Sequence, residues 1–276
     1  NFETVSLKGN STLKLDGDWI VNELKVDGNI MLDGNITITE SMLLINGEIE
    51  PTGSSQLLLD ASASAVSENQ AFVNGALYRE GHGELFFPIG KNGQYAPITY
   101  LEVPIENASL YGIEAFDDEV VLESLPDEIL QVSNEFHWKA IEGIPDSPVQ
   151  LTLTPTLEQL ATGEGILTIL QANEGLAEVV NLEGTTELSI IRSNKPFTGS
   201  YLFVGVQSNN ALSVYEKTIA TIYPNPFAAE LNIVPADERF YQLKIYDSRG
   251  MVIHESMLNG KKTLNTSSYP SGVYLL

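Results

Sequence analysis

The residues best suited to acid–base or metal chemistry are the three histidines and the carboxylates beside them. His82 lies between Glu80 and Glu84, so it could act as a base or bind a metal. Strand alternation would put these three side chains on one face beside a Gly-rich turn, where exposure to solvent is the default. His137 and His254 stand in separate segments, and the chain has no His-Glu-x-x-His pair. We expect His137 to be packed in a strand, and we expect no catalytic and no metal-ligating residue.

The turns of the first 60 residues carry oxygen ligands of the type that Ca²⁺ prefers. None of these turns matches the nonapeptide repeat of calcium-binding solenoids or the loop of the EF-hand. Asp and Asn also suit the positive φ angles that such turns need. We therefore expect no cofactor and keep Ca²⁺ as the alternative. The turn dipeptides are Asp16-Gly17, Asp27-Gly28, Asp33-Gly34 and Asn46-Gly47.

A denser acidic run covers residues 114–119, with the sequence Glu-Ala-Phe-Asp-Asp-Glu. A solvated loop is the common explanation of such a run, and chelation of a cation is the alternative. Two carboxylates elsewhere could form a glycoside hydrolase site, because their pairing in space is invisible in a sequence. Exposed rings could instead bind sugars by stacking. The available rings are Trp19, Tyr95, Tyr100 and Trp138.

The chain lacks several residues and motifs on which enzymes depend. Cysteine is absent, which excludes disulfides, a thiol nucleophile, Cys-ligated zinc and iron–sulfur clusters. Gly-x-Ser-x-Gly, Walker A and dinucleotide-binding motifs are also missing. We expect a protein that is not an enzyme, with a secreted hydrolase or a carbohydrate-binding module as the alternatives.

The charge of the 276-residue chain is large and unevenly placed. With 14 Lys plus Arg and 37 Asp plus Glu, the formal net charge is 14 − 37 = −23, so nucleic acid is not an expected partner. Residues 1–217 hold 9 basic and 32 acidic residues, a net charge of 9 − 32 = −23, whereas residues 218–276 hold 5 of each. This asymmetry indicates two units with different roles.

Short runs in which β-branched and aromatic residues alternate with polar ones predict an all-β protein. Residues 1–65 repeat a small strand-and-turn unit, which predicts an irregular β-solenoid or the edge of a sandwich. The small-residue tract at residues 61–65 is predicted to be a connector. Residues 66–217 are predicted to form an antiparallel β-sandwich, and residues 218–276 a separate domain. The side chains expected to point inward in the first region are Leu13, Leu15, Leu24, Val26, Ile30, Leu32, Ile36, Ile38, Leu43 and Ile45.

The chain shows no sign of a membrane-spanning helix, because no run of about 18 apolar residues is present. The start, Asn1 to Thr4, lacks the features of a signal peptide, so we expect any such peptide to have been removed or to lie outside this sequence. At the other end, residues 272–276 read as a strand that stops in mid-course.

Residues 221–276 carry an ordered series of motifs. Pro224 and Pro226 remove two amide donors from the first motif, which therefore enters the domain extended rather than in a ladder. The motifs are Tyr223-Pro224-Asn225-Pro226, Leu231-Asn232-Ile233, the segment 241–250, Leu264-Asn265-Thr266 and the segment 269–274. The series resembles the type A C-terminal sorting domain of the type IX secretion system of Bacteroidota.

This resemblance implies a small Ig-like β-sandwich that the outer-membrane translocon and a shuttle protein recognise during export. It implies a location at the cell surface or in the medium, with attachment to a surface glycan or a lipopolysaccharide anchor as a further alternative. The family pattern has one more strand after Gly-Val-Tyr, and we expect that strand to be missing here. The residues expected to serve recognition are Tyr223, Pro224, Asn225, Pro226, Gly250, Gly272 and Tyr274.

The region before these motifs is similar to adhesin-like and gliding-associated surface proteins. That similarity implies an adhesive or structural cargo, and gliding is one such role. The segments that carry the similarity are 72–78, 86–91, 95–98, 136–139 and 193–198.

Overall fold

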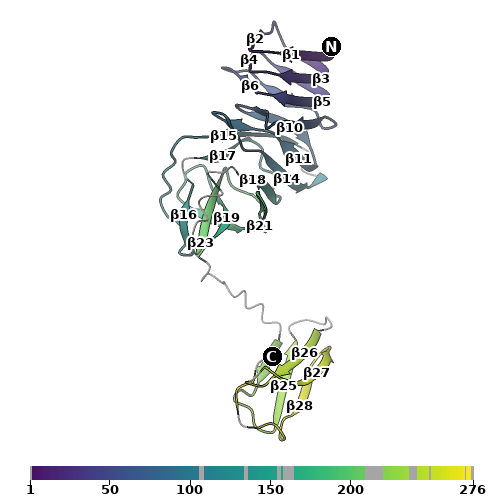
Figure 1. Cartoon of the computed structure of the whole chain (residues 1–276), viewed down its shortest axis with the longest axis vertical. Helices are drawn as coiled ribbons and strands as arrows, with labels where there is room; N and C mark the ends of the chain where they lie inside the picture. The colour runs from purple at the N-terminus through teal and green to yellow at the C-terminus, as the bar shows by residue number, and fades with distance from the viewer. Residues whose placement is uncertain are drawn as a thin grey trace. The chain divides into compact units, whose positions relative to one another are not determined.

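A computed structural model describes residues 2–105, 109–133, 136–153, 157, 165–208, 220–235, 241–248, 250–270 and 272–274 (Figure 1). These residues form the strands β1 to β28, which confirms the all-β class. The chain divides into two compact units, Asn1–Ala211 and Leu212–Leu276. The expected boundary between residues 217 and 218 lies outside the described residues. No helix with the length and hydropathy of a bilayer-spanning segment occurs in the described part of the chain.

The first unit begins with a β-solenoid of about four turns, at the purple end of Figure 1. One wall contains parallel pairs from β1 to β3 to β5, followed by β7 and β8. The other wall is the parallel series β2-β4-β6-β9. The solenoid was one of two predicted alternatives for this region, and it is confirmed. The strands of the first wall are β1 (Phe2–Lys8), β3 (Trp19–Asp27), β5 (Ile36–Asn46), β7 (Leu57–Leu59) and β8 (Ser64–Ser67), and those of the second are β2 (Ser11–Lys14), β4 (Ile30–Asp33), β6 (Glu48–Pro51) and β9 (Phe72–Val73).

Coils stack in register because equivalent residues recur with a spacing of about 19. Leu13 pairs with Leu32 across the second wall, and Leu24 pairs with Met42 across the first. Inward side chains from successive coils therefore form one continuous core. The prediction for Leu43 and Ile45 is wrong: these side chains are only half-buried, while their neighbours Met42 and Leu44 fill the core.

The corners of the coils are built from glycine and asparagine. Gly28 has a φ of 142°, and a Cβ at this position would overlap the backbone of Gly9 in the preceding coil. The side-chain oxygen of Asn10 accepts a hydrogen bond from the Asn29 amide at 3.3 Å, and that of Asn29 accepts one from the Glu48 amide at 3.2 Å. The turn dipeptides thus supply positive φ angles, as predicted, at corners between parallel coils.

The first wall continues without interruption into a β-sandwich. Strand β10 (Leu77–Gly81) pairs in parallel with β7 on one side and antiparallel with β15 (Ser109–Phe116) on the other. The same sheet then runs through β17, β23, β19 and β20, with β16 beside β23. These strands are β16 (Ile129–Val132), β17 (His137–Glu142), β19 (Gly165–Ala172), β20 (Val179–Glu183) and β23 (Tyr201–Ser208).

A second sheet, in the order β11-β14-β18-β22-β21, lies against this one. Its pairings are antiparallel, as predicted for the middle of the chain. Large rings such as Tyr100, Trp138 and Phe197 are fully buried in the core of this unit. The strands are β11 (Gly83–Phe87), β14 (Ile98–Val103), β18 (Val149–Thr152), β21 (Thr185–Glu187) and β22 (Ile190–Arg192), and a short hairpin joins β12 (Gly90–Lys91) to β13 (Gln94–Tyr95).

A buried arginine joins the solenoid to the sandwich. Arg79 on β10 is only 6% exposed. Its guanidinium donates hydrogen bonds to the carbonyls of Ala63, in the last coil, and Phe86, on β11, at 2.7 and 2.6 Å. Arg79 therefore links the backbone of the last coil to that of the sandwich.

The second unit has two small antiparallel sheets that share one core, which agrees with the predicted small sandwich. The first sheet contains β24 (Ala220–Tyr223), β25 (Glu230–Pro235) and β28 (Lys262–Asn265), and the second is the hairpin of β26 (Tyr241–Tyr246) and β27 (Val252–Leu258). The core consists of Leu231, Ile233, Leu243, Ile245, Leu258 and Leu264.

Candidate functional site

The first group of predicted recognition residues lies on the connection between β24 and β25. Tyr223 ends β24, where it pairs with Asn232. The next three residues, Pro224 to Pro226, leave the ladder and are exposed, and both X–Pro peptide bonds are cis. Lys261 places its ammonium group 5.7 Å from the centre of the Tyr223 ring. This segment presents a ring, two prolines and an amide side chain to solvent.

Thr266 holds the end of this connection. Its hydroxyl donates to the carbonyl of Ala228 at 3.1 Å, and its amide donates to the carbonyl of Ala229 at 2.8 Å. Thr266 is buried, whereas Ala228 and Ala229 are exposed, so these bonds tie an exposed connection to the core. Sequence reasoning did not select Thr266 as a site residue, although it closes the Leu264-Asn265-Thr266 motif.

Tyr274 lies between two other rings. The centre of its ring is 5.7 Å from that of Phe227 and 5.6 Å from that of Tyr269. Its hydroxyl donates to the carbonyl of Pro270. Because Phe227 directly follows Pro226, this cluster joins the segment after β24 to the segment that contains Gly272.

A cavity of about 490 Å³ adjoins this cluster. It lies between the turn that follows β26, the start of β27 and the segment around Tyr274. Burial is partial here, and the wall mixes carboxylate, hydroxyl, aromatic and aliphatic groups. The wall of the cavity includes Asp247, Ile253, Tyr269, Gly272, Val273 and Tyr274.

Gly250 shapes the turn that forms one side of the cavity. Its φ is 76°, and its amide donates to the carbonyl of Asp247 at 2.9 Å. The carboxylate of Asp247 accepts a further bond from the amide of Met251 at 3.0 Å. No heavy atom lies within 4 Å of where a Cβ would stand on Gly250. The glycine is therefore required by the backbone angle and not by crowding.

The predicted recognition residues thus fall into two groups. Gly272 and Tyr274 line the cavity, and Gly250 shapes the turn at its side. Pro226 is joined to this group through Phe227. The ring of Tyr223 packs against Lys261 instead and does not line the cavity. Sequence reasoning missed Phe227 and Ile253, whose roles depend on contacts between distant segments.

The two histidine candidates of the first unit, His82 and His137, lie in different surroundings. His82 lies in the turn between β10 and β11, and it is exposed together with Glu80 and Glu84, as predicted. The described residues contain no cluster of three or more His, Asp or Glu side chains that could hold a metal ion. In the second unit, His254 has its Nε2 atom 3.1 Å from the Ser256 hydroxyl.

His137 is buried in a stack of rings on the sheet, which confirms that it is a packed residue. Its ring lies 5.4 Å from Phe116 with nearly parallel planes, and 5.7 Å from Phe203. Burial lowers the pKa of His137 below its usual value, while the carboxylate of Asp118, 3.9 Å from Nε2, acts in the opposite direction. The Nδ1 atom is buried without a hydrogen-bond partner in the described residues.

The acidic run at residues 114–119 has its carboxylates in separate contacts. Glu114 forms an ion pair with Lys91 at 3.5 Å, Asp117 accepts a hydrogen bond from the amide group of Asn92, and Asp118 faces His137. Two carboxylates of the solenoid turns are bound by side chains of the next coil. Asp18 accepts from the Asn35 side chain and Asp27 from the Asn46 side chain, both at 2.8 Å. These carboxylates stabilise loops and coil stacking.

The four candidate sugar-stacking rings do not form a row. Trp138 and Tyr100 are fully buried, and the indole of Trp138 donates to the carbonyl of Ala96 at 2.9 Å. Tyr95 is half-buried. Trp19 is also half-buried, and its ring lies 4.5 Å from that of Phe2, which is 45% exposed. The pair formed by Phe2 and Trp19 is therefore the best-exposed of these surfaces in the described part of the first unit.

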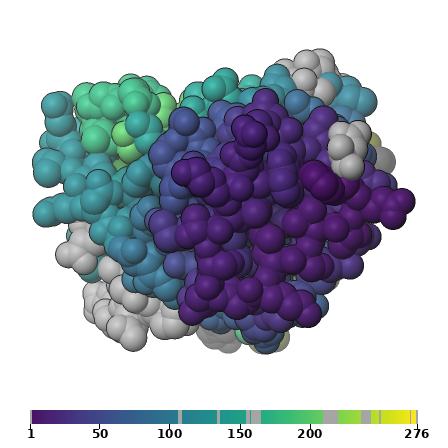
Figure 2. Space-filling model, turned by 90° about the horizontal axis from the view of Figure 1, so that it is seen from above, coloured from purple at the N-terminus to yellow at the C-terminus, as the bar shows by residue number. Residues whose placement is uncertain are grey.

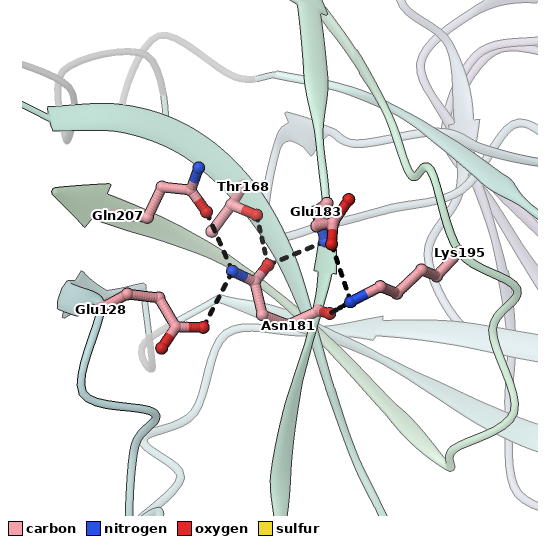
Figure 3. Close-up of polar contacts among 6 residues, drawn as sticks. All are labelled: Glu128, Thr168, Asn181, Glu183, Lys195 and Gln207. Atoms are coloured by element: carbon pink, nitrogen blue, oxygen red, sulfur yellow. Dashed lines mark hydrogen bonds and ion pairs between the residues drawn. The ribbon is translucent and has the colours of Figure 1, made fainter. Parts of the chain in front are cut away.

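A polar network of the sandwich is centred on Asn181 (Figure 3). The side-chain oxygen of Asn181 accepts bonds from the Thr168 hydroxyl at 2.6 Å and from the Glu183 amide at 2.8 Å, and its amide group donates to Gln207 at 2.9 Å. Lys195 reaches the Asn181 carbonyl and forms an ion pair with Glu183 at 2.8 Å. This network coincides with a break in register between β19 and β20. The network therefore supports an irregular strand pairing.

Comparison with known proteins supports the C-terminal unit as the functional site. Residues 221–276 match the family model of the secretion system C-terminal sorting domain. No curated protein and no solved structure matches the chain. The match covers the segment of β24, the cavity and the ring cluster around Tyr274. The chain therefore carries a type IX secretion C-terminal sorting domain, and it is a cargo exported across the outer membrane to the cell surface or the medium.

Proposed function

We propose that residues 1–217 are a non-enzymatic adhesive or structural cargo, and that the outer-membrane translocon and a shuttle protein engage residues 218–276. The observation that carries the proposal is the single sheet that runs from β1 in the solenoid to β20 in the sandwich. A continuous hydrogen-bonded sheet gives a stiff unit that can hold a contact surface away from a membrane. Gliding is one role that such a cargo fills, and a surface glycan or lipopolysaccharide anchor would retain it on the cell.

The space-filling view supports a contact role for the first coils. Figure 2 looks onto the N-terminal coils, drawn in purple, which form one broad face of the molecule in that view. Phe2, Ile20 and Met31 belong to these coils and have exposed apolar side chains. Apolar groups that remain on a strongly acidic unit mark a surface for association.

A carbohydrate-binding module is the second candidate, and the pair formed by Phe2 and Trp19 favours it. Two neighbouring rings, one of them exposed, can pack against the face of a sugar. Substitution of Phe2 by Ala would then weaken binding to a glycan array, whereas Leu188→Ala, at an exposed apolar side chain on another part of the unit, would leave binding unchanged. Equal binding by the two variants would exclude this candidate.

An attachment assay tests the adhesive proposal. A Bacteroidota host that exports the full chain is compared with one that exports only residues 218–276, and both attachment to surfaces and spreading of the colony are measured. We expect attachment to fall when residues 1–217 are absent. Purified full-length chain is incubated in parallel with polysaccharides and peptides. Products that increase with protein concentration would establish a hydrolase and contradict the proposal.

A further inference from the structure

We propose that the secretion machinery reads the sorting domain by adding an extended apolar segment as a strand along the free edge of β27, next to the cavity described above. This inference rests on the sorting function of residues 221–276. It goes further by naming the surface that is read and the kind of partner segment that fits it.

Exposed apolar side chains are concentrated on β27 and at its start. Met251 and Met257 are 62% and 61% exposed, and Val252 and Ile253 are also exposed. Alternation along the strand puts Ile253 and Met257 on the outer face. His254 and Ser256 pair with the core residues of β26 and therefore face inward. The outer face of β27 thus carries Ile253 and Met257 on either side of Glu255, and exposed apolar side chains gathered in this way mark a surface that a partner covers.

The backbone of β27 offers a place for one more strand. Within the described residues, β27 pairs with β26 and with no other strand. A free edge presents a row of amide and carbonyl groups that can template a further strand. Its seven residues span about 24 Å at about 3.4 Å per residue. In strand addition, such main-chain bonds supply affinity, while pockets for alternate side chains supply specificity.

The cavity provides such a pocket at one end of the strand. Ile253 of β27 lines it together with Gly272 and Tyr274, which are two of the residues selected from the sequence motif. A side chain of the added strand can enter this cavity while its backbone follows β27. The motif residues and the strand edge then form one surface, which explains why residues that are far apart in the sequence share one function.

The charge distribution favours an apolar and uncharged partner segment. The sorting region has 5 basic and 5 acidic residues, while the entire net charge of −23 belongs to residues 1–217. On the outer face of the hairpin, Lys244 and Glu255 neutralise one another at 3.6 Å. A basic partner segment would be attracted to the acidic cargo unit. An uncharged apolar strand would instead bind to β27 in preference to that unit.

Export of edge variants tests this inference. Met257→Lys and Ile253→Lys, singly and together, place a charge on the outer face of the edge, where it opposes strand addition. Thr263→Lys on β28 and Leu188→Lys in the first unit are matched controls at other exposed positions. Full-length protein is measured outside the outer membrane and in the periplasm, and thermal unfolding of each purified variant checks its fold. We expect the double variant to lose export to the level of a chain without residues 221–276, and both controls to keep it.

A photocrosslinking measurement keeps the inference testable if a charged variant does not fold. Benzoylphenylalanine replaces Met257 in one strain and Thr263 in another. We expect position 257 to crosslink to an apolar extended segment of an identified secretion component, and position 263 to give no such product. Normal export of the folded double variant, or equal crosslinking at both positions, overturns the inference. If the chain without residues 221–276 is exported as well, the sorting function itself fails.

Discussion

At the scale of single residues, His137 is a titratable side chain that is buried among aromatic rings. Histidine is a common catalytic residue, but the Nδ1 atom of His137 has no hydrogen-bond partner in the described residues. Leaving a buried polar atom unsatisfied costs about 1–3 kcal/mol. Tyr201, whose ring centre is 5.8 Å away, and Lys139, which also lowers the pKa, complete its surroundings. The residue is best explained as part of the packing of the sheet.

A pH dependence of stability follows from this burial. Because the pKa of His137 is lower in the folded state than the usual 6.5, the unfolded chain binds a proton more readily. His137 therefore destabilises the fold as the pH falls below about 6.5, and this effect is absent above that value. We expect His137→Phe to lose less stability than the natural chain between pH 8 and pH 5 in urea unfolding. His82→Phe, at an exposed histidine, is the control, and equal losses in the natural chain and in His137→Phe would contradict the explanation.

The sequence predicted several residue roles because they depend on local chemistry. His82 is exposed beside a Gly-rich turn, and Gly250 has the positive φ expected of a turn. Thr266 and Phe227 were missed as site residues because their partners lie 38 and 47 positions away, at Ala228 and Tyr274. The alternation of apolar and polar residues predicts which face of a strand a side chain lies on. It does not reveal which distant segment packs against that face.

At the scale of elements, the stacked corner glycines fix the spacing of the solenoid coils. Gly9, Gly28 and Gly47 recur every 19 residues, and each of the last two packs on the glycine of the coil before it. We expect Gly28→Ala to destabilise the first unit by about 2–4 kcal/mol, because it combines a strained φ with overlap against backbone. Gly17→Ala, at a positive φ in open space, should cost only about 1 kcal/mol. Urea unfolding of both variants measures the difference, and equal costs would show that coil contact at Gly28 is unimportant.

The coil period was harder to predict from the sequence than the strands themselves. Consecutive Asp-Gly and Asn-Gly dipeptides belong to two different corners, so their spacing conceals the repeat of about 19 residues. The run Met42 to Ile45 is apolar throughout, which removes the alternation that would identify the inward face. The tract at residues 61–65 is not the predicted connector, because Ala63 is buried and β8 begins at Ser64 to pair with β5.

At the scale of the whole molecule, the change from acidic to neutral sequence nearly coincides with the start of the sorting domain. The acidic excess belongs to the cargo, where it favours solubility. The sorting region is neutral and presents rings, a cavity and a strand edge. The all-β class and the sorting motif could be predicted from the sequence because both are local patterns. The continuous sheet could not, since it depends on β10 pairing in parallel on one side and antiparallel on the other.

The most direct test of the central claim is the location of the chain with and without residues 221–276 in a host that has a type IX secretion system. Full-length protein and the deletion variant are quantified in the periplasm, at the cell surface and in the medium, and a protease added to intact cells distinguishes surface from periplasmic protein. We expect the full chain outside the outer membrane and the deletion variant, folded, in the periplasm. Export of the deletion variant at the level of the full chain would contradict the account.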